Sequence, residues 1–323
     1  GGSEPLKINP DKNPAYLKYA MERKQFGQSI AKFDSIIGKI ADITIKTYSA
    51  DTMLYRTVGI IQNAIDELDQ NDSEYYIKMG QAMERFAVEA SMAKIFGSET
   101  SSMVVDNCLQ IFGGYGFIEG YPMAMAYRDD RINQIWEGTN EINRAIVTGY
   151  MMKKVLMEEI SLRGMLKNLG DFLSKDINEN RDLFSNEKHA INGAKMLSVL
   201  IFQEALFAFG QDLKHEQQLS ETLADMFTHL FTAESLIARV KQTMSSDRNS
   251  AMAMNIAKID VAESLLDIIL MSGKCLNRIF EENTPKDILN TVKKLSSNMT
   301  LNTDTIMLKK LLGEYMFEQK INS

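Results

Sequence analysis

The sequence predicts an all-α protein: a helical bundle followed by a second, degenerate helical bundle. Only 5 of the 323 residues are proline, whereas 21 are methionine. Long stretches consist of Ala, Leu, Ile, Lys and Glu, most of which lose little free energy on entering a helix. Apolar residues also recur at three- and four-residue steps, which is the period of one helix face.

The first long helix is predicted to begin at Phe33 and to reach about Leu68. One face of it carries Phe33, Ile36, Ile37, Ile40, Ala41, Thr44 and Tyr48. The polar stretch 69–73 interrupts this pattern, so we expect the helix to end there. A shorter helical segment, from about Tyr16 to Lys24, precedes it and is expected to pack in the same bundle.

Two further helices complete the expected first bundle. One runs from about Glu74 to the glycine pair Gly113-Gly114, and its apolar stripe contains small residues that let a neighbouring helix come close. The other is predicted from about Asn140 to Leu156. We therefore divide the chain into a lead-in (1–14, disordered or left by cloning), a helical domain (15–157) and a helical extension (158–323).

The extension carries a faint internal repeat of the first bundle. Ile40-Ala-Asp-Ile matches Leu223-Ala-Asp-Met, and Ala50-Asp-Thr-Met matches Ala233-Glu-Ser-Leu, both at one constant offset with no gap between them. Repeated units at a fixed offset are typical of duplicated helical modules, although amphipathic helices also resemble one another by chance. The extension has no counterpart of the glycine turns or of Glu137, so we expect it to serve packing or docking.

Charge and spacing exclude several classes of function. The net charge is -7 and the pI is about 5.2, which argues against a nucleic-acid partner. Phosphate-loop, Rossmann, paired-cysteine and Glu-x-x-His di-iron patterns are all missing from the sequence. No apolar run is expected to approach the roughly 20 residues of a membrane span, and two isolated cysteines suit a reducing compartment. A cytoplasmic location is expected.

Glu137 is the residue most suited to chemistry. It lies in Trp136-Glu-Gly-Thr139, directly before a predicted helix. A carboxylate can act as a general base if neighbours such as Trp136 dehydrate it and raise its pKa, and if a substrate C–H lies within reach. The alternative is a structural one, since a negative charge before a helix N-terminus is mildly stabilising.

Two other segments suit a cofactor that carries phosphates. Arg23 offers a charged fork for a pyrophosphate, and the glycines after Gln110-Ile-Phe112 let a ligand approach the backbone. Each feature also has an ordinary structural explanation: a surface salt bridge for Arg23 and a helix C-cap for Gly113-Gly114.

Taken together, Met21-Glu-Arg-Lys-Gln-Phe-Gly27, Gln110-Ile-Phe-Gly-Gly-Tyr-Gly-Phe117 and Ile135-Trp-Glu-Gly-Thr-Asn-Glu-Ile-Asn-Arg144 closely resemble the C-terminal helical domain of the flavin-dependent acyl-CoA dehydrogenases. The resemblance extends from about Tyr19 to Gly149. It implies an enzyme that oxidises an acyl-CoA thioester to the trans-2-enoyl product. Glu137 would remove the α-proton while the β-hydrogen leaves as hydride to FAD.

The same resemblance implies the remaining site residues and partners. FAD held largely by a neighbouring subunit would contact Arg23, Lys24, Gln25, Phe26, Gln110, Ile111, Phe112, Gly113 and Gly114. Thr139, Asn140 and Glu141 would meet the flavin side, and Gly138 would touch the acyl-CoA. A homo-oligomer, a dimer or tetramer, follows from the shared FAD, and an electron-transferring flavoprotein would receive the electrons.

The sequence also departs from the family pattern. Members of the family have an N-terminal helical domain and a middle β-domain before the segment that matches Tyr19, so the chain resembles a C-terminal fragment that is not expected to turn over alone. Some relatives place the base on the helix before the arginine motif, but here the Glu-Gly-Thr position is occupied by Glu137. The extension resembles the very-long-chain branch, in which a similar appendage is associated with peripheral membrane contact.

Two other functions stay open from the sequence. An acyl-CoA oxidase shares the base and the flavin and differs in its access to oxygen. A non-catalytic helical assembly domain could have kept the motifs by descent.

Overall fold

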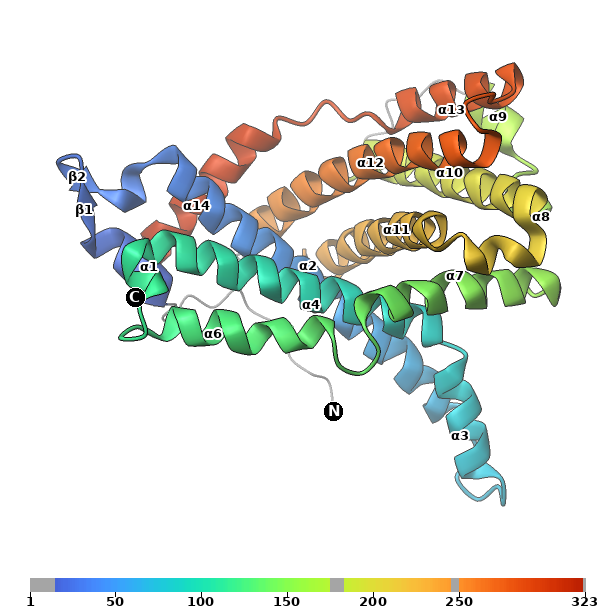
Figure 1. Ribbon diagram of the computed structural model, residues 1–323, viewed down its shortest axis with the longest axis horizontal. Coiled ribbons are helices and arrows are strands. Elements are labelled where there is room, and N and C mark those ends of the chain that lie inside the picture. Colours follow the sequence, from blue (N-terminus) through green and yellow to red (C-terminus); the bar gives the residue numbers. More distant parts are fainter. Residues whose placement is uncertain (1–14, 175–182, 245–249, 322–323) are drawn as a thin grey trace.

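The computed structural model describes residues 15–174, 183–244 and 250–321, and the described part is almost entirely helical (Figure 1). The fold class predicted from the sequence is therefore confirmed. The predicted lead-in, 1–14, lies outside the described residues. The first bundle begins with a short helix, α1 (Ala15–Glu22), and a two-stranded hairpin, β1 (Lys24–Gln25) and β2 (Gln28–Ser29), which leads through η1 (Ile30–Lys32) into the first long helix.

Long helices form the body of the first bundle. Its elements are α2 (Asp34–Asp66), α3 (Tyr75–Glu84), α4 (Ala87–Phe112), α5 (Gly114–Phe117), α6 (Pro122–Asp130), η2 (Arg131–Gln134) and α7 (Asn140–Leu156). α2 and α7 agree with the predicted helices. The predicted helix from Glu74 is in fact two helices, because Arg85 and Phe86 cap their adjoining ends. α3 and the end of α2 project from the rest of the molecule (Figure 1).

The extension contains a second set of helices. After the short α8 (Leu162–Met165) and α9 (Leu169–Ser174) come α10 (Ser185–Phe209), η3 (Gly210–His215), α11 (Gln217–Thr243), α12 (Ser250–Phe280), α13 (Lys286–Met299) and α14 (Thr305–Ile321). α11 packs against α12, as α2 packs against α4 in the first bundle. α11 also crosses α2 and α7, and this contact joins the two bundles.

The hydrophobic core is continuous across the boundary between the two bundles. Ala41 and Tyr48 of α2 and Val147 of α7 belong to the same buried cluster as Leu223 and Leu265 of the extension. A smaller cluster lies at the other end of the molecule, where Met316 and Phe317 of α14 pack with α1, α2 and α4. The last helix thus returns to the first one (Figure 1).

Ion pairs across the α2–α11 contact relate the repeated positions to each other. Arg239 lies 3.5 Å from Asp51, and Arg56 lies 3.9 Å from Glu234. At the constant offset of the repeat, Arg239 corresponds to Arg56 and Glu234 corresponds to Asp51. Each helix therefore supplies an arginine to the acid of the other, as two copies related by a twofold axis would.

Contacts between arginines and aromatic rings show the same reciprocal relation between α2 and α11. The guanidinium of Arg56 lies 4.5 Å from the centre of the Phe231 ring, and that of Arg239 lies 6.0 Å from the centre of the Tyr48 ring. Tyr48 and Phe231 again correspond at the offset of the repeat. This reciprocal pattern supports the internal repeat that the sequence indicates, because a chance similarity would not produce matched contacts in space.

One described segment, Ser185–His215, is long and apolar enough to cross a membrane, contrary to the expectation from the sequence. It comprises α10 and η3, and 50% of its apolar window is buried inside the protein. Leu197, Ile201 and Ala205 are fully buried, and α10 packs against α11, α12 and α13. This arrangement is that of a core helix.

Candidate active site

Glu137 lies in a strained turn between η2 and α7. Glu137 and Gly138 have φ angles of 55° and 79°, in the left-handed region that a residue with a Cβ adopts only at a cost. Thr139 then caps α7, since its Oγ1 accepts a hydrogen bond of 3.3 Å from the amide of Ile142. The turn directs the chain into the helix and leaves the side chain of Glu137 on the surface.

Two side chains restrain this turn by hydrogen bonds to its backbone. Lys94 Nζ and Asn143 Nδ2 each donate a hydrogen bond of 2.9 Å to the carbonyl oxygen of Gly138. Burial lowers the pKa of Lys94, against the opposing effect of Glu141, Glu99 and Glu137. A strained conformation persists only when its surroundings fix it, and these two donors supply that constraint.

A groove of about 730 Å³ opens beside Glu137. It is lined by Thr47, Ala50, Asp51, Leu54, Ala93, Lys94, Gly97, Ser98, Thr100, Ser101, Val104, Asn133, Trp136 and Glu137. Small side chains of α2 and α4 form much of its lining, so an apolar chain could lie along it. Trp136, however, is 57% exposed and Glu137 is exposed. The dehydration of Glu137 that we expected is not provided by the described residues of this chain.

A second pocket, of about 810 Å³, joins the arginine motif to the double glycine. Its lining includes Tyr19, Arg23, Gln25, Phe26, Gln110, Ile111, Phe112, Gly113, Gly114 and Tyr115. The structure thus brings together two segments that are far apart in the sequence and that the sequence assigns to one cofactor. Lys24 does not line this pocket.

The hairpin before α2 presents part of this pocket. Its two-residue loop, Phe26-Gly27, has φ angles of 51° and 81°, as a tight hairpin turn requires, and Phe26 is 93% exposed. The guanidinium of Arg23 lies 5.4 Å from the centre of the Tyr115 ring. The ion pairs among the described residues do not include the surface salt bridge that was the structural alternative for Arg23, and Arg23 lines the pocket.

Gly113 explains why the backbone is accessible at this pocket. It caps α4 with a φ angle of 60° and a ψ angle of -137°, a conformation that glycine adopts far more readily than other residues. The C-cap expected from the sequence is therefore present, and it coexists with the pocket. An exposed aromatic side chain, a cation and an open backbone together fit a dinucleotide cofactor.

Two residues beyond the turn lie in different surroundings. The side chain of Asn140 is 3% exposed and makes hydrogen bonds inside the protein. Glu141 lines a different pocket, of about 290 Å³, between α7 and the start of α11. Hydrogen bonds from its own backbone and from Thr139 lower the pKa of Glu141.

Sequence reasoning missed the residues that support the turn. Lys94, Asn143 and Arg144 were not singled out, although Asn140, Asn143 and Arg144 follow the spacing of one helix face. Three polar residues on one face of an otherwise packed helix were the available signal. The partners of Asn140 and Arg144 on α4 and α11 could not be inferred, because they depend on how the helices pack, whereas Asn143 bonds the backbone of its own turn.

Comparison with known proteins places both halves of the chain in one family. Residues 14–152 and residues 193–294 each match a family described as "Acyl-CoA dehydrogenase, C-terminal domain". The probable acyl-CoA dehydrogenase of Bacillus subtilis is 30% identical over 86% of the chain and 48% of that protein's length. The caffeyl-CoA reductase–Etf complex subunit CarC of Acetobacterium woodii is 35% identical over 43% of the chain and 31% of its own length.

A solved structure extends the match to nearly the whole chain. The acyl-CoA dehydrogenase of Bacillus anthracis, complexed with FAD, superposes with a TM-score of 0.87 at 27% identity, over 95% of this chain and 52% of that protein. The chain thus spans about half the length of these two Bacillus relatives. The chain belongs to the acyl-CoA dehydrogenase family and corresponds to the C-terminal domain of its members.

Proposed function

We propose that the chain provides the catalytic base and part of the FAD site of an enzyme that dehydrogenates acyl-CoA thioesters between the α and β carbons. The observation that carries this proposal is the position of Glu137. Its carboxylate stands on a strained turn at the border of a groove, and Lys94 and Asn143 fix that turn. Strain of this kind is retained where geometry matters for function.

Two residues of the turn would have different roles in proton transfer. Glu137 would accept the α-proton of the thioester, and the adjacent Gly138, which has no side chain, would leave room for the substrate. FAD, when bound, accepts the β-hydrogen as hydride. Because Glu137 is exposed in this chain, the dehydration that a base needs would come from the substrate and from the parts of the site outside the chain.

A cofactor shared between two copies, and hence an oligomer, is part of this proposal. Lys94, which bonds the turn of Glu137, and Gln110, which lines the arginine and glycine pocket, are roughly 25 Å apart along α4 at 1.5 Å per residue. Because the turn and the arginine and glycine pocket lie toward different ends of this helix, we infer that a flavin reacting beside Glu137 would contact the arginine and glycine pocket of a second copy.

Electrons would leave through an electron-transferring flavoprotein. Support comes from the relative of Acetobacterium woodii, whose name identifies it as a subunit of an Etf complex. Incubating the reduced full-length protein with oxygen, and separately with an electron-transferring flavoprotein, tests this step. Rapid reduction of the flavoprotein with little peroxide is expected. Stoichiometric peroxide at a comparable rate would instead identify an acyl-CoA oxidase.

The central test is the substitution Glu137→Gln in the full-length protein with its FAD. We expect anaerobic bleaching of the flavin by acyl-CoA to slow by about 10²- to 10⁴-fold, because the base is lost. Glu159→Gln is a matched control, since Glu159 is exposed and lines neither pocket. FAD content, measured by absorbance, should be the same in all three proteins.

Two results would reject the proposal. Unchanged bleaching in Glu137→Gln would remove this residue from the chemistry. A purified full-length protein without flavin, which does not take up added FAD, would favour a non-catalytic helical assembly domain.

A further inference from the structure

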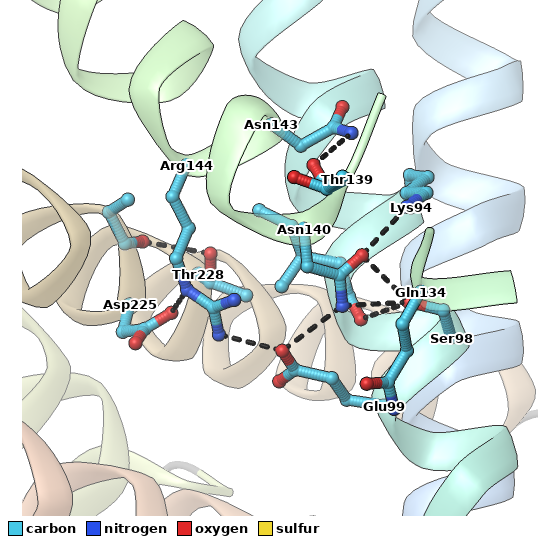
Figure 2. Close-up of polar contacts among 12 residues, drawn as sticks. Lys94, Ser98, Glu99, Gln134, Thr139, Asn140, Asn143, Arg144, Asp225 and Thr228 are labelled. Carbon is cyan, nitrogen blue, oxygen red and sulfur yellow. Dashed lines mark hydrogen bonds and ion pairs between the residues drawn. The ribbon is translucent and has the colours of Figure 1, made fainter. Parts of the chain in front are cut away.

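A continuous path of polar contacts connects Lys94, which bonds the turn of Glu137, to Asp225 of the extension (Figure 2). It begins at the carbonyl of Gly138, which accepts a hydrogen bond of 2.9 Å from Lys94 Nζ. The same Nζ donates a hydrogen bond of 2.7 Å to Oδ1 of Asn140. One ammonium group therefore fixes the turn and the first residue of α7 together.

Asn140 continues the path along α4. Its Nδ2 donates to Ser98 Oγ and to Glu99 Oε1, each at 3.1 Å, and its Oδ1 also accepts from Ser98 Oγ at 3.2 Å. The single hydroxyl hydrogen of Ser98 is shared with the carbonyl oxygen of Ile95 at 3.1 Å, so the contacts with Lys94 and Glu99 carry the path. Asn140 is 3% exposed, so water does not compete for these contacts.

Arg144 then bridges the two bundles. Its Nη2 donates to Glu99 Oε1 at 2.8 Å, and its Nε donates to Asp225 Oδ1 of α11 at 2.7 Å. Burial opposes the charge of Arg144, but the carboxylates of Asp225 and Glu99 outweigh it and raise its pKa. The guanidinium thus remains charged, and its two acid partners come from different bundles.

We propose that Asp225 is a positioning residue for the reaction: through Arg144, Glu99, Asn140 and Lys94 it holds the turn that carries Glu137. This inference rests on the proposed function for its catalytic consequence, whereas the mechanical link itself does not. It gives the extension a specific role in the active site, although none of the described residues of the extension lines the groove.

The physical reason is that each member of the path fixes the next. Without Asp225, Arg144 keeps one carboxylate and can turn toward solvent, which frees Glu99 from its fixed position. Asn140 then loses a rigid acceptor, and Lys94 loses the partner that keeps it under Gly138. A turn with two left-handed residues relaxes when its restraints weaken, because those restraints are what hold the strained conformation.

The experiment measures the turn directly and then the chemistry, in the full-length protein with its FAD. The variant Asp225→Asn removes the charge with little change of shape. Lys309→Gln is the matched control, because Lys309 also joins the bundles, bonding Asp42 at 2.9 Å and Glu263 at 2.6 Å, but has no contact with the path. Amide hydrogen exchange is followed in a peptide that covers residues 136–142, and flavin bleaching by acyl-CoA is measured in parallel.

We expect exchange in this peptide to accelerate about tenfold in Asp225→Asn and to stay near the wild-type rate in Lys309→Gln. Turnover of Asp225→Asn should fall by a similar factor with little change in the KM for acyl-CoA, and Asp225→Glu should restore part of it. Unchanged exchange in Asp225→Asn, or equal acceleration in both variants, would overturn the link. Faster exchange with normal bleaching would keep the mechanical link but reject Asp225 as a positioning residue. The role of Glu137 is tested independently by Glu137→Gln, so the two proposals fail separately.

Discussion

The two helix pairs α2–α4 and α11–α12 share a packing scheme but differ in what surrounds it. Both pairs bury apolar faces, and α2 and α11 exchange matched arginine–acid contacts. In the first bundle, α4 ends at Gly113, which lines the arginine and glycine pocket, and α7 begins after the turn of Glu137. In the extension, α10 ends at Gly210 in a similar conformation, but Gly210 does not line that pocket, and the sequence of the extension has no Glu-Gly-Thr turn. The difference teaches that the helices specify assembly, and that the turns between them specify chemistry.

A single pair of corresponding positions shows how far the copies have diverged. Lys46 and His229 correspond at the offset of the repeat, and each bonds a residue of α12. Lys46 bonds the fully buried Asp260 at 2.5 Å, so its charge is neutralised. His229 faces Ser264 at 3.2 Å and burial lowers its pKa, so it is neutral near pH 7.

The largest expected effect concerns the docking of α14 on α2. A methyl group at Gly313 would collide with the backbone carbonyl of Ile37, so Gly313→Ala should destabilise the protein by about 3 kcal/mol. Gly273→Ala is the control, since nothing lies within 4 Å of the added carbon, and it should stabilise the protein by about 0.5–1 kcal/mol. Urea unfolding measures both. Equal effects would mean that α14 does not pack closely on the first bundle.

A second comparison concerns two glycines whose substitution should have the same effect on stability but different effects on FAD binding. Gly113 and Gly210 end helices in different bundles with similar angles, φ of 60° and 54° and ψ of -137° and -128°. Alanine at either position should cost about 2 kcal/mol of stability. Only Gly113→Ala should weaken FAD binding, as measured by titration of the flavin-free protein, because only Gly113 lines the cofactor pocket. Weakened binding in both variants would argue for a general loss of structure.

The reciprocal arginines are expected to contribute unequally. The side chain of Arg239 is 11% exposed and that of Arg56 is 35% exposed, so solvent screens Arg56 more. Arg239→Gln should cost about 2 kcal/mol, because it leaves Asp51 partly buried without a cation. Arg56→Gln should cost less than about 1 kcal/mol. Thermal or urea unfolding of each variant gives the comparison, and the reverse order would contradict the burial argument.

The smallest effect is the dependence of stability on pH through His229. Burial lowers its pKa from 6.5, with Asp267 opposing and Lys46 adding to that effect, so the unfolded chain binds a proton more readily than the folded one. Stability should therefore fall as the pH drops below about 6.5, by up to about 1.4 kcal/mol per pH unit. Urea unfolding at pH 7.5 and pH 5.5 measures this effect. His229→Gln should reduce the difference in the free energy of unfolding between the two pH values, whereas substitution of the exposed His215 should leave that difference as it is in the wild type.

Much of the fold was predictable because the signals are local. The apolar period placed α2 within two residues of its observed ends, and α7 was predicted at its observed bounds. The break at Arg85 and Phe86 was missed, since neither residue is a helix breaker. In the site, the Glu137 turn and the pocket of Arg23 and Gly113 followed from recognisable motifs. The inward direction of Asn140 did not, because the partners that draw it inward lie on another helix.

The return of α14 to the N-terminal end has a consequence for synthesis. Met316 and Phe317 complete the cluster that covers Leu17 and Ile40, so those early residues remain without their full cover until the ribosome has released the last turns of this helix. The apolar side chains of this cluster therefore stay partly exposed to solvent while the intervening helices are synthesised. A chaperone that binds exposed apolar segments is thus expected to associate with the growing chain and to leave once α14 emerges.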